Sequence, residues 1–220
     1  MFEQLLQEFK NYDAGFRAVK KVWLSTKDDL RKNYKGELYI QKLGEAKQIH
    51  DSTLADMKKQ GLLVCDAAFS KAREAINEVF IKPVPDDFIS SMEVIKLMGK
   101  NLSEIEINAY IEKYKGNYAA YRAITSYLNN LGVITIKPLR PEAINEDIDE
   151  GERLAIQFFQ DFIPDTYRTA IMMVENNPIS SLDAELQGII SGDYEDGNEA
   201  DASNQELKDL VAASLMRDKE

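Results

Sequence analysis

The chain has 220 residues, of which 44% are hydrophobic, so it can bury a core in one large domain or two small ones and is not disordered throughout. A single cysteine, Cys65, excludes an intramolecular disulfide and indicates a reducing compartment. No stretch approaches the roughly 18 consecutive apolar residues of a membrane-spanning helix, and the N-terminus lacks the pattern of a secretory signal, so we expect a soluble, cytoplasmic protein.

The net charge of −11 is divided unequally along the chain. Residues 1–140 hold 22 Lys and Arg against 18 Asp and Glu, whereas residues 141–220 hold 5 against 20. This asymmetry predicts two functional halves. Because the second half repels phosphate and the first is only mildly basic, we expect no direct binding to DNA.

The first 34 residues carry apolar side chains at helical spacing. They predict two short helices that are broken near Asp13–Gly15. A hydroxyl at Thr26, followed by the carboxylates of Asp28 and Asp29, is typical of a helix start, since the hydroxyl caps free N–H groups and acids favour the positive end of the dipole.

A long helix is predicted from Gly36 to about Lys82, where proline is absent and an apolar stripe recurs every three or four residues. It would span ~70 Å as one helix, or form two helices if Gly61 breaks it. The narrow stripe favours a coiled-coil-like contact with one other helix, from this chain or from a second copy. We therefore assign residues 1–82 to the first region and expect self-association through the stripe, with these contact residues: Leu43, Leu54, Met57 and Val64.

A compact three-helix bundle is predicted for residues 86–137, after Pro83 and Pro85 end the long helix. Its helices are expected at 86–98, 103–114 and 117–131. The signals at their ends are a capping box of Ser103 with Glu106, a left-handed Gly116, and an N-cap at Asn117.

The run 132–137 is the one β-type segment of the sequence, bounded by Gly132 and Pro138. A lone strand needs a partner. It could pair with another copy or with an unrecognised segment, or run extended into the linker that follows.

Residues 142–190 are predicted to form an acidic helical region, with helices at about 149–162 and 165–175. Pro178 would end them, and Ser180 or Ser181 would cap a short helix through Ile190. The acidic run 146–152 fails the EF-hand spacing and is interpreted as an acid-rich helix N-terminus.

Residues 191–220 are predicted to form a flexible acidic tail that ends in an amphipathic helix. The spacer would cover 191–204 and the helix 204–216. We expect the helix to dock on a partner, or alternatively to fold back on its own body, through these residues: Leu207, Leu210, Val211 and Leu215.

Motifs for catalysis, metal binding or nucleotide binding are absent from the sequence. His50, the single histidine, has no metal-ligand side chain at i+4, and Cys65 has no nearby base. There is no phosphate-binding loop and no nucleophile elbow. Helix 117–131 could be taken for a DNA-recognition helix, but Arg122 is its sole basic residue. We therefore expect no cofactor, no metal and no enzymatic activity.

One resemblance covers residues 26–131. The segment 33–40, the long charged helix, the proline break and the segment 112–118 together resemble small helical proteins of tailed phages and prophages of Gram-positive bacteria. Some of those proteins are head-assembly components. The resemblance implies a virion or assembly role, with capsid or portal proteins as partners and the host cytoplasm or the virion as location. It supplies no catalytic residues and does not include the acidic second half.

The sequence thus predicts an all-α protein: a long helix or helical hairpin of coiled-coil type, a small helical bundle, at most one short β segment and an acidic C-terminal helical region. The leading functional hypothesis is a non-enzymatic structural or assembly protein, in a phage head or virion. The alternative is an acidic binding or inhibitory protein that imitates nucleic acid and is directed at a host protein. An unrecognised enzyme would need a pocket with converging polar groups.

Overall fold

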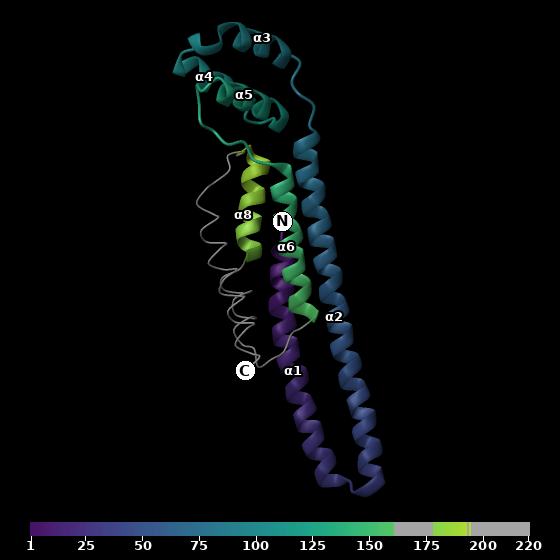
Figure 1. Cartoon of the computed structure of the whole chain (residues 1–220). Helices are drawn as coiled ribbons and strands as arrows, with labels where there is room; N and C mark the ends of the chain where they lie inside the picture. The colour runs from purple at the N-terminus through teal and green to yellow at the C-terminus, as the bar shows by residue number, and fades with distance from the viewer. Residues whose placement is uncertain (161–177, 193, 195–220) are drawn as a thin grey trace. The chain divides into compact units, whose positions relative to one another are not determined.

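The protein is all-α, as predicted. A computed structural model of the chain describes residues 1–160, 178–192 and 194 (Figure 1). Its helices, in chain order, are α1 (Glu3–Asn33), α2 (Gly36–Ile81), α3 (Phe88–Met98), the 3-10 turn η1 (Gly99–Asn101), α4 (Glu104–Tyr114), α5 (Tyr118–Asn130), α6 (Pro141–Gln160) and α8 (Pro178–Ser191). None of these described helices has both the length and the apolarity needed to cross a bilayer.

The chain forms two compact units, each built from two stretches of sequence. Unit 1 comprises Met1–Val79 and Glu142–Ser191, and unit 2 comprises Phe80–Pro141 together with the residues from Gly192 onward. The long N-terminal helices and the acidic region 142–190 therefore share one unit. The predicted helix at 165–175 lies outside the described residues.

Helix α1 is continuous, so the predicted break near Asp13–Gly15 is wrong. A Cβ on Gly15 would lie 2.6 Å from Met57 Cε, which shows that α2 approaches α1 closely at this glycine. This interhelical packing outweighs the poor helix propensity of glycine, about 1 kcal/mol. The helix start predicted at Thr26 is also wrong, because the exposed Asp28 and the residues around it continue α1.

Helix α2 is a single helix of 46 residues that passes through Gly61 without a break. It ends at Ile81, just before Pro83, as predicted. Figure 1 shows α1 and α2 side by side as a hairpin. Helix α1 of the same chain therefore packs against the apolar stripe of α2. The sequence had left open whether this partner helix comes from the same chain or from a second copy.

The core of unit 1 forms where α6 and α8 join the hairpin. Phe9 of α1 contacts Phe158 and Phe159 of α6, with ring centroids 4.7 and 5.3 Å apart. The α-amino group of Met1 forms an ion pair with Asp183 of α8 at 2.7 Å. Aromatic contacts and one ion pair near the start of the chain thus link α1 to α6 and the N-terminus to α8.

Helix α6 begins at Pro141, eight residues before the start predicted at Asp149. Ile144 and Ile148 are buried, so the apolar stripe of the helix extends back to the proline. The acidic run 146–152 consequently lies inside α6 and is not a helix N-terminus. Pro178 likewise begins α8 and does not merely end the preceding segment. Proline suits the first helical position, where its missing N–H has no partner to lose.

Unit 2 contains the predicted bundle of α3, α4 and α5. Ser103 and Glu106 form the predicted capping box, and the side chain of Asn117 accepts a hydrogen bond from Ala120 N. Gly116 does not adopt the left-handed conformation predicted for it, since the positive φ angles in this unit fall on Gly99, Gly132 and Gly192.

The segment 132–137 begins in a turn at Gly132 and forms no strand among the described residues, which show only an isolated bridge at Pro138. Beside it, Leu139 N donates a hydrogen bond to the carbonyl of Tyr194 at 2.8 Å. Tyr194 is buried, so the predicted flexible spacer 191–204 is wrong at its start; residues 195–220 lie outside the described part of the chain.

Candidate interaction surface

The α1–α2 hairpin is the most extended feature of unit 1. Three pairs of contacts along it define an antiparallel register: Phe2 with Phe69, Gly15 with Met57, and Trp23 with His50. Helix α6 meets this hairpin at Phe9 and Gly61. The part of the hairpin formed by residues 13–60 extends beyond that contact. We call residues 13–60 the arm.

Burial changes sharply where the arm begins. On α1 the last buried residue is Tyr12, and on α2 the first is Gly61. Every residue of the arm is described by the structure, and each is exposed or half-buried. Two helices alone cannot enclose a side chain on all sides, so the arm has an inner seam but no core of its own.

Large apolar side chains are exposed on both helices of the arm. Ile49, Ile40 and Val22 are 70, 69 and 65% exposed, and Leu24 and Leu38 are about half exposed. The arm also holds 11 Lys and Arg against 7 Asp and Glu, whereas α6 holds one Arg against six Asp and Glu. Unit 1 therefore combines a basic arm with an acidic helix.

The contact residues predicted on α2 lie on the partly covered surface of that helix. Leu43, Leu54, Met57 and Val64 are each half-buried. Met57 faces Gly15 of α1, which identifies this side of α2 as the covered side. The remaining predicted contact residues lie outside the described part of the chain: Leu207, Leu210, Val211 and Leu215.

His50 belongs to the seam of the arm. Its ring lies 4.9 Å from the indole of Trp23, and its Nδ1 is 3.0 Å from an oxygen of Asp51. Lys27 Nζ lies over the Trp23 ring, 5.8 Å from its centroid. Within the described residues, no group of three or more His, Cys, Asp or Glu side chains is arranged to hold a metal ion.

Cys65 is fully buried in unit 1. Burial, reinforced by the negative charge of Glu152, raises the pKa of its thiol to about 12. The thiol is therefore protonated at neutral pH and lacks the thiolate character that a nucleophile needs.

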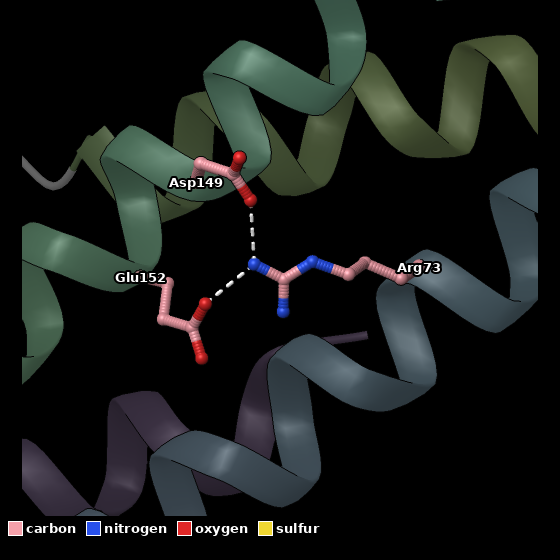
Figure 2. A network of polar contacts seen from close by, with 3 residues as sticks. All are labelled: Arg73, Asp149 and Glu152. Atoms are coloured by element: carbon pink, nitrogen blue, oxygen red, sulfur yellow. Dashed lines mark hydrogen bonds and ion pairs between the residues drawn. The ribbon is translucent and has the colours of Figure 1, made fainter.

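A polar cluster connects α2 to α6 (Figure 2). One terminal nitrogen of Arg73 contacts an oxygen of Asp149 at 2.7 Å and an oxygen of Glu152 at 2.5 Å. Both hydrogen bonds raise the pKa of Arg73, and the one with Glu152 has the larger effect. Sequence reasoning missed this cluster, because residues so far apart in the chain give no local signal of their pairing.

Next to this cluster, the surface of α6 has an open hollow of about 450 Å³. Its lining combines the two carboxylates with Arg153, Ile156, Gln157 and Gln160. Arg153 is itself held by Glu150 of the same helix at 2.6 Å. Three carboxylates and two arginines at this hollow are thus engaged with one another.

Comparison with known proteins adds no family to this description. No protein-family model matches the chain, and no curated protein or solved structure shows significant similarity to it. Function must therefore be inferred from the surface of the molecule.

Proposed function

We propose that this chain is a non-enzymatic structural or assembly protein that acts through protein–protein contacts, with its α1–α2 arm as the main contact surface. The observation that carries the proposal is the arm itself: 48 consecutive residues without a buried side chain, with large apolar groups exposed on both helices. A two-helix hairpin of this kind gains most by packing against further helices.

A second copy of the chain is the partner that fits the arm. Two hairpins that pack antiparallel form a four-helix bundle, in which each helix gains a second neighbour. The same arrangement brings the basic arm of each copy toward the acidic α6 of the other, so the charges of the two copies complement each other.

The resemblance to small helical phage proteins gives this contact a biological setting. It favours a component of a phage head or virion, with capsid or portal proteins as further partners. The alternative, an acidic imitator of nucleic acid, is less well supported because the arm in the same unit is basic, with 11 Lys and Arg against 7 Asp and Glu. A basic surface of this size weakens the negative field that such an imitator would need.

Light scattering coupled to gel filtration tests the contact. The full chain is expected to be a dimer or larger oligomer. The double variant Ile40→Ser/Ile49→Ser should shift it toward monomer without loss of helicity, because both side chains are exposed. The control Gln48→Ser changes an exposed polar residue of the same arm and should leave the oligomer intact. A parent chain that stays monomeric at all concentrations would refute the arm contact.

Copurification followed by mass spectrometry tests the setting. Crosslinked material from the native host or from virions should contain a second copy of this chain together with capsid or portal proteins. Recovery of a host nucleic-acid-binding protein, and of no virion component, would instead favour the imitator hypothesis.

A further inference from the structure

Unit 2 has an apolar surface that its own described residues leave uncovered. Of the fourteen large apolar side chains that are exposed in the described chain, seven fall between Ile81 and Ile105. Leu97 and Ile105 are 86 and 82% exposed. Such a concentration differs from the single apolar residues that are scattered over most protein surfaces.

Helix α3 provides the centre of this surface. Only Ile95 is buried among its 11 residues. Phe88, two helical turns before Ile95, contacts Tyr114 of α4, so this side of α3 faces the bundle. Val94, Leu97 and Met98 follow the i, i+3, i+4 spacing of one helix side, and all three are exposed. We call these three residues the α3 face.

Tyr194, the last residue that the structure describes, is held in place on unit 2. The ring of Tyr194 contacts Tyr118 and Tyr121 of α5, both with centroids 5.4 Å apart, and its carbonyl accepts the hydrogen bond from Leu139. Just before it, Gly192 has a φ of 97°, and a Cβ there would lie 2.7 Å from the Lys115 carbonyl oxygen. The last 26 residues of the sequence are thus tethered to unit 2.

These residues lie outside those that the structure describes, but their sequence is informative. Twelve residues, 195–206, contain no Val, Ile, Leu, Met or aromatic residue, and they precede an apolar run with helical spacing: Leu207, Leu210, Val211, Leu215 and Met216. In a helix the first four would share one side, opposite Asp209 and Ala213. The run is therefore amphipathic.

The length of the tether matches the distance to be covered. Twelve residues can span at most about 40 Å. A bundle of the size of unit 2 has a radius of gyration of about 11 Å, so the α3 face is within reach from Tyr194. The tether is also acidic, whereas residues 80–141 hold eight Lys and Arg against six Asp and Glu.

We propose that residues 207–216 form an amphipathic helix that packs on the α3 face of the same chain. Tethering gives this segment an effective concentration of millimolar order, so even a weak helix-on-helix contact is populated without a second molecule. The C-terminal segment would then shield Val94, Leu97 and Met98 from solvent. This contact lies in unit 2 and does not depend on the arm of unit 1.

Hydrogen exchange of the full chain, read by mass spectrometry, tests the contact from both sides. Leu210→Ser/Val211→Ser should speed amide exchange in α3 about tenfold, because the covering helix is lost. Leu97→Ser should in turn speed exchange within 207–216; this side chain is so exposed that the bundle itself should remain folded. The control Asp209→Ser/Ala213→Ser alters the opposite side of the predicted helix and should change neither segment.

Protection of α3 should also be independent of protein concentration. Unchanged exchange of α3 in the Leu210→Ser/Val211→Ser variant would overturn the proposal. Protection that appears only at high concentration would overturn it as well, since it would assign the α3 face to the tail or body of another copy.

Discussion

The aromatic ring of Phe159 in α6 lies directly against the backbone of Gly61 in the middle of α2. A Cβ on Gly61 would overlap three atoms of that ring. Both residues are buried, and the contact lies where the arm ends and the core of unit 1 begins. The glycine is therefore a site of close helix packing and not a break in the helix.

Substitution of this glycine should destabilise unit 1. In Gly61→Ala we expect the overpacking that displaces Phe159 to cost about 1–3 kcal/mol of the free energy of unfolding. This loss should exceed the gain of about 1 kcal/mol that alanine brings as the better helix former. The matched control is Gly44→Ala in the same helix, where a Cβ would meet nothing within 4 Å. This control should stabilise the protein. Urea denaturation of the two variants measures the difference, and stabilisation at both glycines would contradict the packing argument.

The two glycines also show how far the sequence could predict this hairpin. The stripe of α2 and its end before Pro83 were predictable, because apolar spacing and proline are local signals. The continuity of α1 through Gly15 was not, since it depends on Met57, which approaches from another helix. Tertiary contacts of this kind override intrinsic propensity.

The prolines that begin α6 and α8 were misinterpreted for a different reason. Pro141 and Pro178 were treated as the ends of segments, although proline is equally suited to the first turn of a helix. For α6 the sequence held a usable signal: Ile144 and Ile148 continue the spacing of Gly151 and Ala155 back toward Pro141. The acidic residues between them obscured that stripe.

Arg73 should contribute modestly to the stability of unit 1 by linking α2 to α6. We expect Arg73→Met to lower the free energy of unfolding by about 0.5–1 kcal/mol at low salt, and by less at high salt. Arg153→Met is the control, because that arginine pairs with Glu150 within one helix and both side chains are well exposed. Its substitution should have a smaller effect.

Double-mutant cycles can divide the contribution of Arg73 between its two partners. Glu152 is 22% exposed and Asp149 is 67% exposed, so solvent screens the contact with Asp149 more strongly. Coupling measured with Glu152→Gln should therefore exceed coupling measured with Asp149→Asn. Equal couplings, or a larger one at Asp149, would contradict the geometry shown in Figure 2.

The thiol of Cys65 should be unreactive in the folded protein. At pH 8 a disulfide exchange reagent should label it slowly in buffer and rapidly in denaturant, because the pKa of the buried thiol is raised to about 12. Rapid labelling of the native protein would show that unit 1 opens at this position.

The same pKa shift predicts how stability depends on alkaline pH. The folded pKa of Cys65 exceeds the ordinary value of 9.0, so its contribution is fully present below about pH 9 and is lost as the pH rises toward 12. Cys65→Ser removes the titrating thiol with little change in volume. The variant should lose less stability than the parent between pH 9 and 11 in parallel urea titrations, and an identical decline would contradict the prediction.

The contact surface was only partly predictable from sequence. Apolar spacing placed Met57 in a helix-contact stripe, and Met57 faces Gly15 in the structure. The spacing could not show that the facing helix is α1 of the same chain. The sequence could not show that Ile40 and Ile49 are exposed, because apolar spacing does not tell which side of a helix stays uncovered. The packing of the helices against one another determines which apolar residues remain exposed.

Asn117 should be the most sensitive polar residue of unit 2, because its side chain makes two different kinds of contact. Its Oδ1 accepts from Ala120 N at 3.0 Å and caps α5, while its Nδ2 donates to the Pro83 carbonyl at 2.7 Å and holds the loop after α2. Asn117→Ala removes both and should lower the free energy of unfolding by about 2–3 kcal/mol. Asn117→Ser keeps a capping oxygen but not the donor to Pro83, so its cost should be smaller, about 1–2 kcal/mol. Thermal and urea denaturation of the three chains provide the comparison, and equal losses for serine and alanine would show that the cap contributes nothing measurable.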